Sequence, residues 1–117
     1  MKSIKLIIKT KTHKYPILIG ANLISKLSKI IKSNSIQFNK CLFIIDNKVP
    51  KKFLFKIKKS LKNKEVYFNF INANEKNKNQ NTVDKILKIL LNKNFLRQDC
   101  IITVGGGITG DVGGFAA

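Results

Sequence analysis

A cluster of glycines near residue 110 is the feature of the sequence best suited to chemistry. Gly105, Gly107 and Gly110 have the spacing G-x-G-x-x-G, directly after the apolar run "CIITV" and before a predicted helix. Glycine lets the backbone approach a pyrophosphate closely, and the first turn of a helix offers free N–H donors to an anion. The pattern predicts a phosphate site, although a tight turn with close helix packing would also account for it.

A dinucleotide site also needs a carboxylate that accepts hydrogen bonds from the ribose hydroxyls, usually about 20 residues after the glycines. The sequence stops at Ala117, so no such residue follows. Asp46 comes directly after the apolar run "CLFII" and could serve instead, unless it only forms a turn. Three other charged residues lie near the expected site, and each has a plain structural alternative. Asp111 could stabilise a helix N-terminus, and Glu75 and Lys78 could be a solvated pair.

Hydrophobic patterning predicts the elements that would position these residues. We expect a β-hairpin from residues 3–10 and 15–20, helices over 22–32, 50–62 and 82–94, and strands over 41–45, 65–71 and 100–104. Asn22 and Thr82 are the expected N-caps of the first and third helices. Alternating helices and strands indicate a parallel sheet in one Rossmann-like α/β domain, residues 1–117, with an N-terminal hairpin. The carboxyl ends of its strands would bring Asp46, the 72–81 loop and the glycines together.

Composition excludes several other classes of protein. The chain of 117 residues is 44% hydrophobic, so it can form one globular domain. No apolar run approaches the ~20 residues of a membrane span, and no secretory signal is present, so we expect a cytoplasmic protein without a membrane partner. The net charge is +17, but Arg97 is the single arginine among 23 basic residues. Scattered lysines argue against specific nucleic-acid recognition.

The two cysteines and the one histidine carry no recognisable metal or catalytic spacing. Cys41 and Cys100 each lie in an apolar, strand-like run, so we interpret them as reduced core residues rather than a disulfide or metal pair. His13 lies in the lysine-rich "KTHK", which is typical of a turn.

The segment "GGGITGDVGGFAA" (105–117) resembles the signature of the 3-dehydroquinate synthase family, G-G-G-hydrophobic-x-G-D-x-x-G-F-A-A. "YPILIG" (15–20), "IIDNKV" (44–49) and "NEKNK" (74–78) are similar to further family segments, in the same order. The resemblance covers essentially the whole chain. Two departures are Asn74 in place of the usual glycine before Glu75, and Ile45 in place of the usual threonine before Asp46.

The resemblance implies a nucleotide-binding part that holds NAD. The residues it implies for cofactor binding are Asp46, Lys48, Glu75, Lys78, Gly106, Gly107, Ile108, Gly110 and Asp111. It also implies a second, helical domain with a divalent metal, zinc or cobalt, whose ligands we expect to be absent from these residues. We therefore expect a fragment that ends one or two turns into its last helix. Such a fragment would expose apolar surface, fold marginally and lack catalytic residues.

The activity that the resemblance implies is that of a lyase in the shikimate pathway. It would cyclise the sugar phosphate 3-deoxy-D-arabino-heptulosonate 7-phosphate to 3-dehydroquinate with release of phosphate, using NAD transiently, and the family is often homodimeric. Two alternatives remain. One is a fragment of a related sugar phosphate cyclase or of a metal-dependent alcohol or glycerol dehydrogenase. The other is a non-catalytic module that binds NAD or polyanions.

Overall fold

The computed structural model of the chain describes residues 4–34 and 36–117. Residue 3, at the start of the first predicted strand, lies outside them. In chain order the elements are β1 (Ile4–Lys9), β2 (Lys14–Ile19), the short 3₁₀ helix η1 (Ile24–Lys26), α1 (Leu27–Ser33), β3 (Lys40–Asp46), α2 (Lys51–Ser60), β4 (Glu65–Ile71), the 3₁₀ helix η2 (Glu75–Asn77), α3 (Gln80–Asn92), β5 (Cys100–Val104) and α4 (Gly107–Ala116). The predicted alternation of helices and strands is confirmed.

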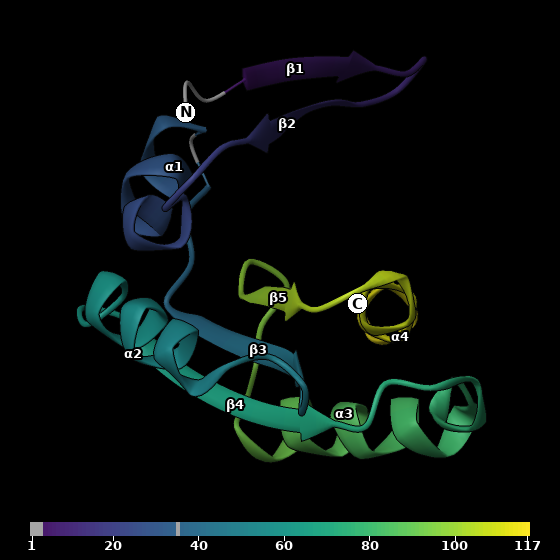
Figure 1. Cartoon of the computed structure of the whole chain (residues 1–117). Coiled ribbons are helices and arrows are strands. Elements are labelled where there is room, and N and C mark those ends of the chain that lie inside the picture. The colour runs from purple at the N-terminus through teal and green to yellow at the C-terminus, as the bar shows by residue number, and fades with distance from the viewer. Residues whose placement is uncertain (1–3, 35) are drawn as a thin grey trace.

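The main body is a parallel sheet covered by helices on both faces (Figure 1). Its strand order is β4-β3-β5, with β3 in the centre and parallel to both neighbours. One face packs against η1, α1 and α2, and the other packs against α3 and α4. This is the predicted α/β architecture, with β1 and β2 forming a separate antiparallel hairpin.

Strand β3 forms the centre of the core because nearly all its side chains are apolar. Residues 41–45 are each 0% exposed, as expected for a strand that is covered on both faces. Because side chains alternate along a strand, Cys41, Phe43 and Ile45 face α1 and α2, whereas Leu42 and Ile44 face α3 and α4. The strand therefore runs rigidly through the core and ends at Asp46, at the edge of the sheet.

The predicted caps of two helices are wrong. Asn22 has a left-handed φ of 57° and precedes η1, and its carbonyl oxygen accepts a hydrogen bond from Ser25 Oγ at 2.7 Å. Helix α3 begins before Thr82, because Asn79 is its N-cap and accepts from the Thr82 backbone N–H at 3.1 Å. Asparagine favours turns and N-caps. For this reason both helices begin at residues other than those that the hydrophobic spacing indicated.

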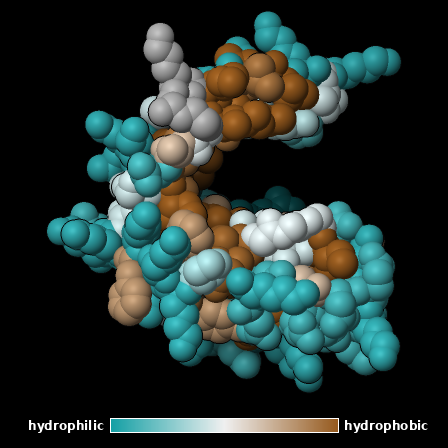
Figure 2. All heavy atoms as spheres, viewed as in Figure 1, coloured by the Kyte–Doolittle hydropathy of each residue, from teal (hydrophilic) through white to brown (hydrophobic). Residues whose placement is uncertain are grey.

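The β1–β2 hairpin exposes apolar side chains on both of its faces. Ile4, Leu6 and Ile7 are each about half exposed, at 52%, 47% and 51%. In Figure 2 a hydrophobic surface on this hairpin borders the hollow that separates it from the main body. The chain therefore exposes apolar surface on this hairpin. None of the helices in the described ranges is long and apolar enough to cross a membrane.

Asp99 ties together the starts of the two strands that lead to the glycines and to Asp46. Its Oδ1 accepts from the backbone N–H of Lys40 at 3.0 Å, and its Oδ2 accepts from the N–H of Leu96 at 2.8 Å. These hydrogen bonds, with a longer one from Asn39, stabilise the charged carboxylate and lower the pKa of Asp99. Asp99 therefore joins segments about 60 residues apart in the sequence.

Asp99→Asn is expected to lower the melting temperature at neutral pH, because the amide accepts fewer of these hydrogen bonds. A folded-state pKa below the unfolded value stabilises the fold above the unfolded pKa, near 3.8, and this stability is lost as pH falls through the folded pKa. The difference between the two proteins should therefore shrink below pH ~4. Thermal melts from pH 7 to pH 3 measure it, with Asp84→Asn on the exposed surface of α3 as the control. A difference that is independent of pH would contradict this role.

Candidate nucleotide-binding site

The carboxyl ends of β3 and β5 are the place where a sheet of this topology is expected to bind a ligand. From β3 the chain crosses through α2 to β4 on one side, and from β4 it crosses through α3 to β5 on the other side of β3. Ligands of open α/β sheets bind outside the carboxyl ends of the strands at such a reversal. Asp46 ends β3 and Gly105 follows β5, and a Cβ built on Gly105 would lie 3.1 Å from Asp46 Cβ. The predicted acid and the predicted glycine turn therefore meet at this point.

Asp46 is held in a fixed orientation by the turn that follows it. Its Oδ1 accepts a hydrogen bond from the Lys48 backbone N–H at 3.1 Å, and its carbonyl oxygen accepts from Val49 N–H at 2.9 Å. The residue is half-buried. Its second carboxylate oxygen has no hydrogen-bond partner within the described part of the chain. Asp46 thus forms the turn that was the alternative interpretation, and one oxygen remains available for a ligand hydroxyl.

The three consecutive glycines, Gly105 to Gly107, are glycine for different structural reasons. Gly105 has φ +152°, and a Cβ there would lie 2.6 Å from Thr109 Oγ1, so the fold itself requires glycine. A Cβ on Gly106 or Gly107 would meet nothing within 4 Å. Because the described residues leave open space beside these two positions, their lack of a side chain suits the close approach of a ligand. Gly106 is also the N-cap of α4, so the free N–H groups of its first turn border that space.

Thr109 is a residue of this region that our sequence reasoning missed. It lies in the first turn of α4 and is 0% exposed, and its Oγ1 is the buried side-chain atom without a hydrogen-bond partner in the described structure. An unpaired buried hydroxyl costs about 1–3 kcal/mol, so a partner is expected. The signal was a polar residue immediately after the glycines, at a position that faces the strands. The space without side chains at Gly106 and Gly107 and the free N–H donors of the first turn fit a bound pyrophosphate.

Lys78 and Asp111 form an ion pair between the loop after η2 and helix α4. Lys78 Nζ lies 2.8 Å from Asp111 Oδ2. The Asp111 carboxylate, with a weaker effect from Glu75, raises the pKa of Lys78. The expected alternative, a solvated Glu75–Lys78 pair, is thus replaced by a pair with Asp111. Neutralisation by Lys78 also reduces the repulsion that Asp111 would exert on a phosphate.

The remaining residues implied by the resemblance lie around the same edge of the sheet. Glu75 begins η2 and is exposed, as are the Lys48 side chain and Gly110, and Ile108 is half-buried. Asn74, which replaces the family's usual glycine, has an extended backbone (φ −146°) that any residue adopts, and its side chain accepts from the Asn77 N–H. The loop therefore does not need a glycine at this position.

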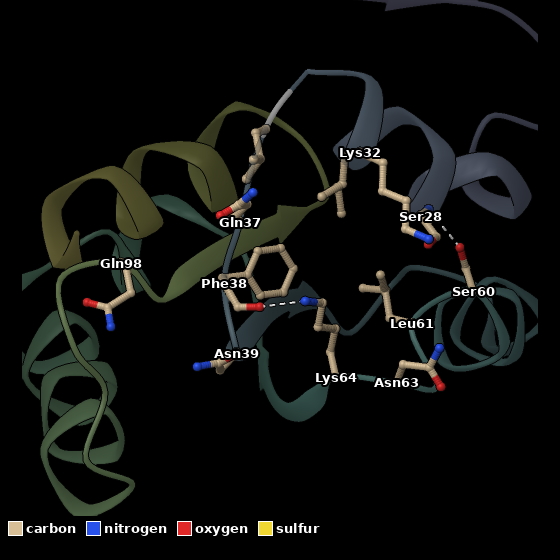
Figure 3. Close-up of a pocket in the computed structure, with 12 residues that line it drawn as sticks. Ser28, Lys32, Gln37, Phe38, Asn39, Ser60, Leu61, Asn63, Lys64 and Gln98 are labelled. Carbon is tan, nitrogen blue, oxygen red and sulfur yellow. Dashed lines mark hydrogen bonds between the residues drawn. The ribbon is translucent and has the colours of Figure 1, made fainter.

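Among the cavities formed by the described residues, a small one borders the carboxyl-terminal edge of the sheet near Lys78. It has a volume of about 220 Å³ and lies between the start of α3 and α4, with Lys78, Val112 and Phe115 in its lining. A larger cavity, about 660 Å³, lies at the opposite, amino-terminal edge of the sheet (Figure 3). There Lys64 Nζ donates to the Phe38 carbonyl oxygen at 2.7 Å, so its charge already has a partner within the fold.

The described residues contain no group of three or more histidine, cysteine, aspartate or glutamate side chains that could hold a metal ion. His13 lies in the exposed hairpin turn, where its Nδ1 is 2.7 Å from Thr12 Oγ1.

Sequence comparison finds relatives along the whole chain. The family profile described as 3-dehydroquinate synthase N-terminal matches residues 68–117. The 3-dehydroquinate synthase of Pelagibacter ubique (strain HTCC1062) is 50% identical over 117 residues, which are 100% of this chain and 32% of that protein. That of Clostridium botulinum (strain Alaska E43 / Type E3) is 38% identical over 116 residues, 97% of this chain and 33% of that protein. The chain spans about a third of the length of these curated relatives.

Solved structures share the fold. A crystal structure of 2-deoxy-scyllo-inosose synthase superposes with a TM-score of 0.84 at 23% identity, over 97% of this chain and 32% of that one. A second structure of that enzyme, complexed with carbaglucose-6-phosphate, NAD+ and Co2+, superposes with a TM-score of 0.83 at 23% identity, over 97% of this chain and 31% of that one. Together with the sequence relatives, this shows that the chain is a homologue of 3-dehydroquinate synthases and matches their N-terminal region.

Proposed function

We propose that residues 1–117 are the NAD-binding unit of a 3-dehydroquinate synthase. The observation that carries the proposal is the meeting of Asp46 with the glycine turn at the reversal point of the sheet. The relative that is 50% identical along the whole chain supports the family's reaction as the activity. That reaction would cyclise 3-deoxy-D-arabino-heptulosonate 7-phosphate to 3-dehydroquinate with release of phosphate. The proposal extends to a cytoplasmic enzyme that forms a homodimer, as the family resemblance implies.

Two parts of this edge would recognise different parts of the dinucleotide, and a third would support them. The free carboxylate oxygen of Asp46 would accept hydrogen bonds from ribose hydroxyls. The backbone N–H groups at Gly106 and Gly107 would donate to pyrophosphate oxygens. The Lys78–Asp111 pair would hold the 72–78 loop beside the glycine turn, with Lys48, Glu75, Ile108 and Gly110 around the same edge.

When bound, NAD would supply a hydride acceptor that lies next to the sugar phosphate. The residues of this chain would hold and orient the cofactor rather than move protons. The proposal accordingly assigns no catalytic residue and no zinc or cobalt ligand to these 117 residues.

Asp46→Asn is expected to weaken NAD binding by about 10–100-fold, because a hydrogen bond to a charged group contributes about 1.5–3 kcal/mol. Calorimetric titration of the chain with NAD measures the dissociation constant. Asp84→Asn removes the same charge from exposed α3 and should leave the affinity unchanged. The proposal is wrong if the parent chain is folded and binds no NAD, or if both variants lose affinity equally.

The reaction itself requires a separate test on the longest reading frame that contains these residues. A 3-dehydroquinate synthase would release 3-dehydroquinate and phosphate without net reduction of NAD. A metal-dependent alcohol or glycerol dehydrogenase would instead accumulate NADH with its product. Product analysis by mass spectrometry, with NADH followed by absorbance, separates the two activities.

One observation favours a second candidate function, a non-catalytic module that binds polyanions. The chain has a net charge of +17, which attracts nucleic acids without sequence specificity. Titration with duplex DNA at two salt concentrations tests this candidate, because contacts with phosphates weaken steeply as salt rises. Salt-sensitive DNA binding in a chain that does not bind NAD would favour the module over the enzyme.

A further inference from the structure

The two cysteines of the chain lie opposite each other on neighbouring strands. Cys41 of β3 and Cys100 of β5 are partners in the register of the parallel pair. Both pack on the sheet face that is covered by α1 and α2. Both are free thiols. Cysteines 59 positions apart in the sequence are thus brought side by side by the fold.

The spacing of paired strands allows a bond between these two sulfurs. Neighbouring strands lie about 4.7–4.9 Å apart, and disulfides form when the two Cα atoms are about 4.4–6.8 Å apart. Their Cβ atoms point to the same side of the sheet, so the thiols can approach without a change of register. The preferred Cβ separation of a disulfide, about 3.5–4.5 Å, is slightly shorter than the strand spacing. Formation of the disulfide would therefore draw the two strands slightly together. Added thiol reagents should reduce such a bond readily.

The two thiols differ in access and in acidity, as the members of a redox pair do. Cys41 is 0% exposed, whereas Cys100 is partly exposed. The neighbouring Cys41 thiol lowers the pKa of Cys100, whereas the neighbouring Cys100 thiol and burial raise the pKa of Cys41. A thiolate is the form that attacks an oxidant, so Cys100 is suited to react first and Cys41 to resolve the product.

We propose that Cys41 and Cys100 form a modification site in which hydrogen peroxide converts the two thiols into a reversible intramolecular disulfide. The Cys100 sulfur attacks one peroxide oxygen, the O–O bond breaks, and the released hydroxide takes a proton to form water. This leaves Cys100 as a sulfenic acid. The Cys41 sulfur then attacks the Cys100 sulfur, and the leaving hydroxide takes the Cys41 proton to form a second water. Two thiols are oxidised, and one peroxide is reduced to two waters.

The position of the pair connects it to the candidate nucleotide-binding site at the far end of the same strands. Asp46 follows Cys41 by five residues, and Gly105 follows Cys100 by five residues. A disulfide would fix the spacing of β3 and β5 at their starts, and these strands carry Asp46 and the glycine turn at their ends. The proposal does not depend on NAD binding, since the oxidation needs only the folded sheet.

The test is to treat the reduced 117-residue chain with hydrogen peroxide at neutral pH and to measure its intact mass. Disulfide formation predicts a loss of about 2 Da, the disappearance of both reactive thiols and one cross-linked peptide pair after proteolysis. Dithiothreitol should restore the original mass. In Cys41→Ser, dimedone should trap Cys100 as a sulfenic acid, whereas in Cys100→Ser the buried Cys41 should remain a thiol under the same treatment.

The same treatment of the chain in urea provides the matched control for geometry. Closure of the Cys100 sulfenic acid to the intramolecular disulfide should be about 10-fold slower there, because the unfolded chain no longer holds the sulfurs together. The proposal is overturned if both thiols survive while added glutathione is consumed, if only intermolecular disulfides form, or if the sulfenic acid closes to the intramolecular disulfide at the same rate in the native and the unfolded chain. Oxidation of Cys100 to a sulfinic acid with Cys41 still free would also overturn it.

Discussion

Gly113→Ala is expected to lower the free energy of unfolding by about 1–3 kcal/mol, the usual cost of forcing extra volume into a packed core. Gly113 lies in α4, where the helix packs on β5, and a Cβ there would lie 2.2 Å from Thr103 Cγ2. Real Cβ atoms do not approach so closely, so the helix would have to move off the strand. Urea denaturation followed by circular dichroism measures the loss, which is a large share of the stability of a small domain.

The neighbouring Gly114 supplies a matched control on the same helix. A Cβ at Gly114 meets nothing within 4 Å, so Gly114→Ala should leave stability unchanged or raise it by up to about 1 kcal/mol through helix propensity. Adding Thr103→Ala to Gly113→Ala removes the clashing methyl group and should recover most of the loss. Equal destabilisation by the two glycine substitutions would show that helix packing on Thr103 is not the cause.

Gly106→Val is expected to have the opposite profile, with a large effect on NAD binding and a small effect on folding. Gly106 has a backbone that valine adopts (φ −88°, ψ −164°), and a Cβ there meets no described atom within 4 Å. If the pyrophosphate occupies that space, the side chain would displace it, at an overpacking cost of about 1–3 kcal/mol or roughly 10–100-fold in affinity. Calorimetric titration with NAD measures the affinity, and urea denaturation measures the stability.

The control for this variant is again Gly114→Ala, which lies on α4 beyond its first turn and should bind NAD as the parent chain does. The combination of lost binding and intact folding is informative, because it separates a glycine needed by a ligand from one needed by the protein. Unchanged affinity in Gly106→Val would contradict a pyrophosphate at the glycine turn. A simultaneous loss of folding would instead assign Gly106 a role in the structure.

The strands of the main sheet could be predicted from the sequence because burial on both faces leaves a continuous apolar signal. The predicted ranges 65–71 and 100–104 agree with β4 and β5, and 41–45 lies within β3. The starts of the helices were harder to predict from the sequence, since Asn22 and Asn79 act through backbone geometry and capping rather than through hydrophobic spacing. The predicted length of the last helix, one or two turns, was also too short, because α4 begins within the glycines and runs from Gly107 to Ala116.

Part of the candidate site could likewise be predicted from the sequence, and part could not. The convergence of Asp46 and the glycines followed from parallel topology, but the strand order that places β3 beside β5 depends on long-range pairing. The pair between Lys78 and Asp111 also required three-dimensional contact. Local sequence cannot tell which glycine faces a neighbouring side chain and which faces open space, so the different reasons for Gly105 and Gly106 emerged only from the structure.

The β1–β2 hairpin has a consequence for the colloidal behaviour of this chain. Its two strands pair only with each other within the described residues, so each has an outer edge that another chain could extend. Lys9 and Lys14 lie directly opposite each other in its register, and Lys5 lies on the outer strand. Positive charge of this kind keeps such edges from joining, and dissolved salt screens it over about 10 Å at 0.1 M. Ionic strength therefore controls whether these apolar edges stay apart or associate.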